Sequence, residues 1–109
     1  MAYDEELAKR VKTMIGNTAG FVEKKMFGGV GYLIHGNMAC GVNGDRLIVR
    51  LEPQEYEMAL GKPFVSIFDM TGRPMKGWVT VAPEGLRTQT ELKAWVEQGV
   101  AFAQTLPHK

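Results

Sequence analysis

Hydrophobic and polar positions follow a helical period at the start of the chain and then change to a strand pattern. In residues 4–16 the apolar side chains recur every three or four positions, and acidic residues precede basic ones, which predicts a helix. Residues 21–51 form short stretches rich in β-branched and aromatic side chains, separated by turns that contain glycine. They predict a meander of antiparallel strands, because tight hairpins exclude parallel neighbours.

The second half of the chain predicts two helices around two further strands. Residues 53–60 begin with proline and precede a glycine, as short helices do. Residues 64–68 and 77–81 predict strands. Residues 88–91 form a Thr-Gln-Thr-Glu capping box that starts a long C-terminal helix. The fold class is therefore α+β, an antiparallel meander sheet flanked by N- and C-terminal helices.

Turn signals assign two faces to the predicted sheet. Two-residue loops at 36–37 and 43–44 would place Leu33 opposite Cys40, and Cys40 opposite Leu47. The core side would then carry Leu33, Met38, Cys40, Val42, Leu47, Val49 and Leu51. The other side would carry Tyr32, Ile34, Ala39, Gly41, Arg46, Ile48 and Arg50.

Length and composition narrow the class of protein. The 109 residues, 45% hydrophobic and 23% charged, predict one globular domain over residues 1–109. One cysteine, Cys40, and two histidines supply neither an internal disulfide nor a structural zinc site, so we expect no cofactor or metal. No apolar run approaches the roughly 18 residues of a membrane span, and the first residues are acidic. We expect a cytoplasmic protein with no membrane partner.

Residues with catalytic potential have simpler structural interpretations. Gly28-Gly29 invites comparison with a phosphate-binding loop, but a strand follows it, which favours bulge or close-packing glycines. Cys40 and His35 would lie diagonally across a hairpin, too far apart for a direct hydrogen bond. Most carboxylates lie on predicted helices as solvated charges. We expect no enzyme and no catalytic residue, and a thiol or small-ligand site near Cys40 is the third hypothesis.

Positive charge concentrates in the sheet region although the net charge is only +1. Residues 24–50 hold four cationic side chains against Asp45, and residues 62–81 hold three against Asp69. Two interpretations remain open. These cations could protect sheet edges from pairing, or they could form a shallow cationic surface with Phe27, Tyr32 and Trp78 as stacking aromatics.

Three motifs carry a family resemblance. Residues 24–29 read Lys-Lys-Met-Phe-Gly-Gly, residues 36–38 read Gly-Asn-Met, and residues 71–79 read Thr-Gly-Arg-Pro-Met-Lys-Gly-Trp-Val. With them the chain resembles, over essentially its whole length, the N-terminal domain of the TfoX/Sxy family of bacterial competence regulators. The resemblance implies a secretion-chaperone-like α+β domain. It also implies co-regulation of competence genes with the cyclic-AMP receptor protein rather than catalysis.

The leading hypothesis is therefore a non-enzymatic regulatory module that acts by protein–protein contact. The alternative is direct, weak and salt-dependent binding of nucleic acid. Either partner would be bound by the basic, glycine-rich loops, with candidate residues Lys24, Lys25, Phe27, Gly28, Gly29, Arg73, Met75, Lys76 and Trp78. A homodimer through a sheet edge, or through the face predicted to carry Tyr32 and Ile48, is a further expectation.

Overall fold

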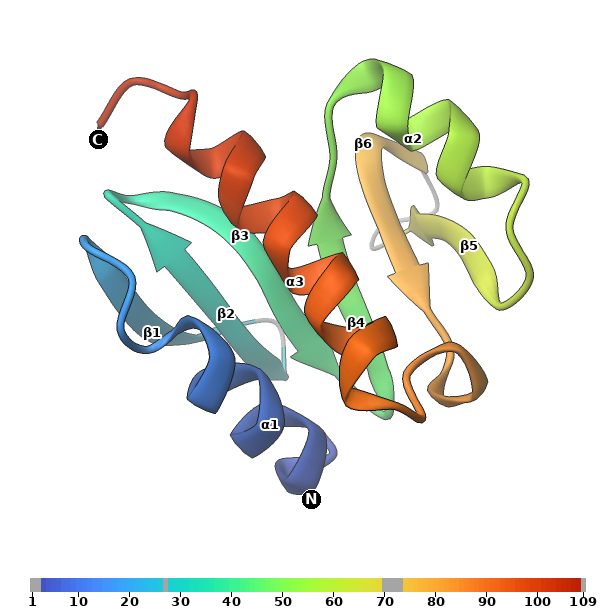
Figure 1. Ribbon diagram of the computed structural model, residues 1–109, viewed down its shortest axis with the longest axis horizontal. Helices are drawn as coiled ribbons and strands as arrows, with labels where there is room; N and C mark the ends of the chain where they lie inside the picture. Colours follow the sequence, from blue (N-terminus) through green and yellow to red (C-terminus); the bar gives the residue numbers. More distant parts are fainter. Residues whose placement is uncertain (1–2, 27, 70–73, 109) are drawn as a thin grey trace.

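The computed structural model describes residues 3–26, 28–69 and 74–108, which form three α-helices and a six-stranded antiparallel sheet (Figure 1). The strand order is β1-β2-β3-β4-β6-β5. This arrangement confirms the predicted α+β meander. The elements are α1 (Glu5–Ile15), β1 (Phe21–Met26), β2 (Gly29–Ile34), β3 (Asn37–Asn43), β4 (Arg46–Arg50), α2 (Pro53–Leu60), β5 (Val65–Asp69), β6 (Pro74–Val81) and α3 (Gln89–Gln104).

Local capping explains where the helices begin. The Asp4 side chain accepts hydrogen bonds from the backbone N–H groups of Glu6 and Leu7 at the start of α1. At α3 the Glu91 N–H donates to Thr88 Oγ1 at 3.1 Å, and the Thr88 N–H donates to Glu91 Oε1 at 3.2 Å. Both predicted helix starts are confirmed, because capping is encoded within four consecutive residues.

All three helices cover the same face of the sheet (Figure 1). The α3 helix packs on β2, β3 and β4, and α2 packs on β5 and β6. Gly99 allows a close approach of α3, because a Cβ there would collide with the backbone carbonyl of Ala39. The resulting core lies between the helices and one side of the sheet. No helix in the described ranges is long and apolar enough to cross a bilayer.

The hairpin turns lie one residue away from their predicted positions. Ile34 pairs with Asn37, so the β2–β3 loop consists of His35 and Gly36, with φ of 51° and 85°. Two consecutive positive φ angles are the signature of a type I′ turn. The β3–β4 loop likewise contains Gly44 and Asp45, because Asn43 pairs with Arg46. Neither shift alone exchanges the faces of a strand.

A bulge between β2 and β3 exchanges the two faces of β2. Tyr32 pairs with Cys40, whereas Leu33 pairs with Met38, so Ala39 is the extra residue. The prediction that Leu33 and Met38 face the core is wrong, and so is the prediction that Tyr32, Ile34 and Ala39 face away from it. Cys40, Val42, Leu47, Val49 and Leu51 belong to the core as predicted, together with Tyr32, Ile34 and Ala39.

Candidate functional site

The two predicted halves of the cationic site lie far apart. Lys24 and Lys25 are on β1, an outer strand, and Trp78 is on β6, with three strands between them. Adjacent strands lie about 4.8 Å apart, so roughly 19 Å separates β1 from β6. The two halves also lie at opposite ends of the sheet, since the β1–β2 turn is next to Val42 whereas Trp78 pairs with Arg50. They do not form one continuous surface.

The remaining candidates divide in the same way. Gly28 lies in the β1–β2 connection, Gly29 begins β2, and Met75 and Lys76 belong to β6. Phe27 and Arg73 lie outside the described residues. Tyr32, considered as a stacking aromatic, is fully buried, and its hydroxyl donates to the Ala8 carbonyl at 2.9 Å. Burial raises the pKa of Tyr32, with the Glu23 carboxylate adding to the effect.

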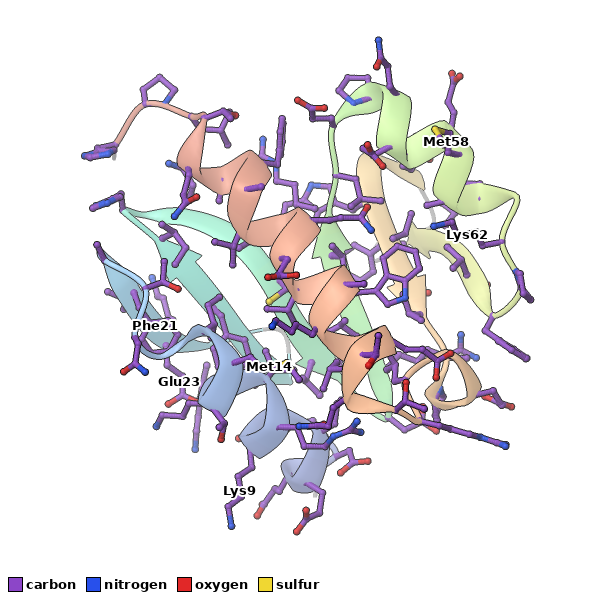
Figure 2. The ribbon with its side chains drawn as sticks, in the orientation of Figure 1. Lys9, Met14, Phe21, Glu23, Met58 and Lys62 are labelled. Atoms are coloured by element: carbon purple, nitrogen blue, oxygen red, sulfur yellow. The ribbon has the colours of Figure 1, made fainter. Side chains whose placement is uncertain are left out.

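The two lysines of β1 are exposed but alternate between faces. Lys25 pairs with Val30, a core residue on the helix-covered face, whereas Lys24 pairs with Gly31 on the other face. Beside α1, Lys25 shares a hollow of about 360 Å³ with acidic and basic side chains. Among them, Lys12 Nζ lies 3.3 Å from Glu23 Oε1, and Figure 2 shows Glu23 on β1 beside α1. This region has mixed charge and is not uniformly cationic.

The glycine pair has a structural role. Gly28 has a φ of 74°, which L-residues seldom adopt. A Cβ on Gly29 would collide with the Val42 carbonyl oxygen of β3. Both observations support close-packing and turn glycines, as the sequence favoured, and not a phosphate-binding loop.

The other half of the site contains a cluster that the sequence did not reveal. The Arg50 guanidinium carbon lies 5.5 Å from the ring centroid of Trp78 and 5.4 Å from that of Phe102. These three residues come from β4, β6 and α3. Both distances are typical of cation–π contacts. The cluster therefore joins a predicted residue, Trp78, to two residues that were not candidates.

An open pocket of about 390 Å³ adjoins this cluster. We call it the Arg50 pocket, and it is lined by Arg50, Leu51, Pro53, Tyr56, Glu57, Gly77 and Phe102. In the part of the chain that the structure describes, the guanidinium makes no hydrogen bond or ion pair with another residue. Its N–H groups can therefore bind an anionic group that enters the pocket.

A second hollow, of about 690 Å³, lies between α1 and α3. Met14, Val96 and Val100 supply its apolar part, and Lys93 and Glu97 supply opposite charges. None of the candidate residues lines it. Because it holds one positive and one negative side chain, this hollow does not favour a partner of either charge.

The thiol hypothesis is not supported by the geometry. Cys40 is fully buried in the core, and burial raises the pKa of its thiol to about 12. His35 lies in the β2–β3 turn and stacks on His108, with 3.8 Å between the ring centroids. A nucleophilic cysteine requires access and a lowered pKa, and Cys40 has neither.

These observations describe a small α+β domain with a solvent-accessible arginine–aromatic cluster and a sequestered thiol. The model of the TfoX N-terminal domain family matches residues 14–103, and the chain belongs to this family. The predicted resemblance is confirmed. The family is one of non-catalytic regulatory domains, and membership supports a competence-related regulatory role in general. A search among curated proteins found no match.

Proposed function

We propose that this domain is a non-enzymatic regulatory module that binds a protein partner through the Arg50 pocket. The observation that carries the proposal is the Arg50 guanidinium, which contacts two aromatic rings beside an open pocket and has no carboxylate partner among the described residues. The partner group that fits this chemistry is a carboxylate on an acidic segment of a protein.

The energetics favour such a contact. A guanidinium binds a carboxylate through two parallel N–H···O bonds, and the rings of Trp78 and Phe102 hold the side chain in place beforehand. Less side-chain entropy is then lost on binding. Arginine and tryptophan are also the residue types that most often dominate the affinity of protein interfaces.

The identity of the partner is proposed from the family resemblance. Co-regulators of this kind act with the cyclic-AMP receptor protein, so that protein is the first partner to test. Direct DNA binding is less favoured, because Lys24 and Lys25 point to opposite faces of β1 and share their edge with Glu23. Phosphate binding would require cations gathered on one surface.

The test is an amide-shift NMR titration of the isotope-labelled chain. One arm adds the cyclic-AMP receptor protein encoded in the same genome, and the other adds short single- and double-stranded DNA at low and near-physiological salt. We expect shifts around Arg50, Tyr56 and Trp78 with the protein. Salt-sensitive shifts confined to residues 24–29 with DNA, and none with the protein, would overturn the proposal.

Two variants locate the contact. Arg50→Gln removes the charge and keeps a polar side chain, and it should weaken protein binding by at least about tenfold, since a hydrogen bond to a charged group contributes about 1.5–3 kcal/mol. Lys24→Gln removes one charge from the opposite edge and should bind like the wild type. Equal affinities for both variants would exclude the Arg50 pocket as the binding site.

A further inference from the structure

The outer strand β5 and the residue before it contain a nearly palindromic, uncharged segment that ends before Asp69. Residues 64–68 read Phe-Val-Ser-Ile-Phe, so aromatic, aliphatic and hydroxyl positions repeat symmetrically about Ser66. The strand lies at one end of the sheet order. Phe64 and Ile67 are 50% and 45% exposed, and Ser66 is exposed as well. An exposed edge segment without charge is a surface that pairs readily with another strand.

The hydrogen-bond pattern shows which backbone groups face outward. The Ala82 N–H donates to the Phe64 carbonyl at 2.8 Å, and Val65 pairs with Val81 in the same register. In an antiparallel pair, hydrogen-bonded and non-hydrogen-bonded positions alternate. The N–H and C=O groups of Ser66 therefore point toward β6, whereas those of Val65 and Ile67 point away from the sheet. These outward groups make no backbone hydrogen bond to the described turns, loops or caps.

We infer that a second copy of this chain pairs with β5, strand against antiparallel strand, about a two-fold axis that passes beside Ser66. Val65 then lies opposite the partner's Ile67, and Ile67 opposite the partner's Val65. Each pair joins two residues whose backbone groups point outward, so the four central hydrogen bonds can form. The two six-stranded sheets become one continuous sheet.

The side chains are complementary in this register. The aliphatic pairs lie on the face covered by α2, because Val65 and Ile67 pair with the core residues Val81 and Val79. Phe64 and Phe68 flank this paired segment, since Phe64 precedes β5 with a φ of 67° and Phe68 lies at the irregularity between Ile67 and Asp69. No charged group in residues 64–68 meets its own copy.

The choice of a second copy over a foreign strand rests on this self-complementarity. A two-fold axis places each residue type opposite a matching type only when the strand is palindromic about the axis. The β1 edge lacks the property, because an axis at Glu23, Lys24 or Lys25 places that charge against itself. The inference goes beyond the proposed function and does not depend on the Arg50 pocket.

Disulfide trapping tests the register. Ser66 and its copy would form a non-hydrogen-bonded pair with Cα atoms about 4.5 Å apart, a separation that a disulfide spans. The variant is Ser66→Cys, and Lys24→Cys on β1 is the matched control. Cys40 is fully buried and stays out of the reaction. Preassembled thiols meet at an effective concentration near millimolar, so Ser66→Cys at about 10 micromolar should oxidise to a covalent dimer about 100-fold faster than the control.

Two results would overturn the inference. One is equal oxidation rates for Ser66→Cys and Lys24→Cys. The other is a wild-type protein that keeps the mass of a monomer in sedimentation equilibrium from micromolar to millimolar concentration. Any strand that pairs with β5 would then come from another protein. Neither result bears on binding at the Arg50 pocket, because the Lys24→Gln and Arg50→Gln titrations report on that pocket separately.

Discussion

The two outer strands of the sheet differ in how their free backbone groups are protected. The β1 edge carries Glu23, Lys24 and Lys25 in succession, and Glu23 is paired with Lys12 of α1. The β5 edge carries no charge between residues 64 and 68, and the strand's charged residue, Asp69, stands at its end. Natural sheets commonly guard their edges with lysine, and an unguarded edge is available for association. Both edges expose backbone groups, so the placement of charged side chains distinguishes the edge that stays in water from the edge that we infer pairs with a second copy.

The neighbourhoods of the two edges differ in the same sense. Beside β1 lies the hollow of mixed charge shared with α1. Beside β5 lies α2, whose Met58 side chain is 66% exposed (Figure 2). Exposed apolar side chains near an unguarded edge are typical of an interaction surface.

Removing the charges of β1 should give the largest effect. The triple variant Glu23→Val, Lys24→Thr and Lys25→Val converts β1 into a second unguarded edge. Each copy would then have two pairing edges, and association would continue past the dimer into open-ended assemblies. Light scattering should show a mass that grows well beyond that of a dimer. A mass equal to that of the wild type would contradict the role assigned to these charges.

Introducing a charge on β5 should have the next largest effect. Ser66→Lys places two ammonium groups together on the two-fold axis, and like-charge contact at an interface costs several kcal/mol, so dimer affinity should fall about 100-fold. Ser66 is exposed, so the free energy of unfolding should change by less than about 0.5 kcal/mol. Sedimentation equilibrium and urea unfolding measure the two quantities. The control Ser66→Thr should keep the wild-type affinity, and a Ser66→Lys chain that still dimerises would contradict the register.

Ionisation of the buried Cys40 thiol should have a smaller effect, a loss of folding stability at high pH. Burial raises the pKa of Cys40 to about 12, above the ordinary value of about 8.5 that the thiol has in the unfolded chain. The folded state therefore holds the proton more tightly. The stability contributed by this group is complete below about pH 8.5 and is lost as pH rises toward about 12, with a slope of at most about 1.4 kcal/mol per unit.

The matched measurement is urea unfolding of the wild type and of Cys40→Ala between about pH 8 and about pH 11. The wild type should lose stability faster than the variant across this range. Parallel curves for the two proteins would show that ionisation of Cys40 does not contribute.

Features of the fold that depend on consecutive residues could be predicted from the sequence. The capping box at Thr88, the proline that starts α2 and the glycine turns each act within a few positions. The face of Tyr32 could not be predicted, because the bulge at Ala39 arises from pairing between two strands and leaves no turn signal. One inserted residue is enough to exchange the faces.

The candidate site shows the same limit. Trp78 was identified through its motif, but Arg50 reaches it because β6 pairs with β4, and Arg50 reaches Phe102 because α3 packs on β4. The palindrome around Ser66 is visible in the sequence. Its position on an outer strand depends on β6 lying between β4 and β5. Strand order is a property of the whole sheet, and short motifs do not encode it.

The most direct test of the assembling edge is an NMR measurement on a mixture of two differently labelled preparations of the wild-type chain. Only contacts between copies give signals that link the two labels. The pairing about Ser66 predicts such contacts between Val65 of one copy and Ile67 of the other, with none at β1. Contacts between copies at residues 21–26, or an absence of contacts at β5 in a sample of dimeric mass, would contradict it.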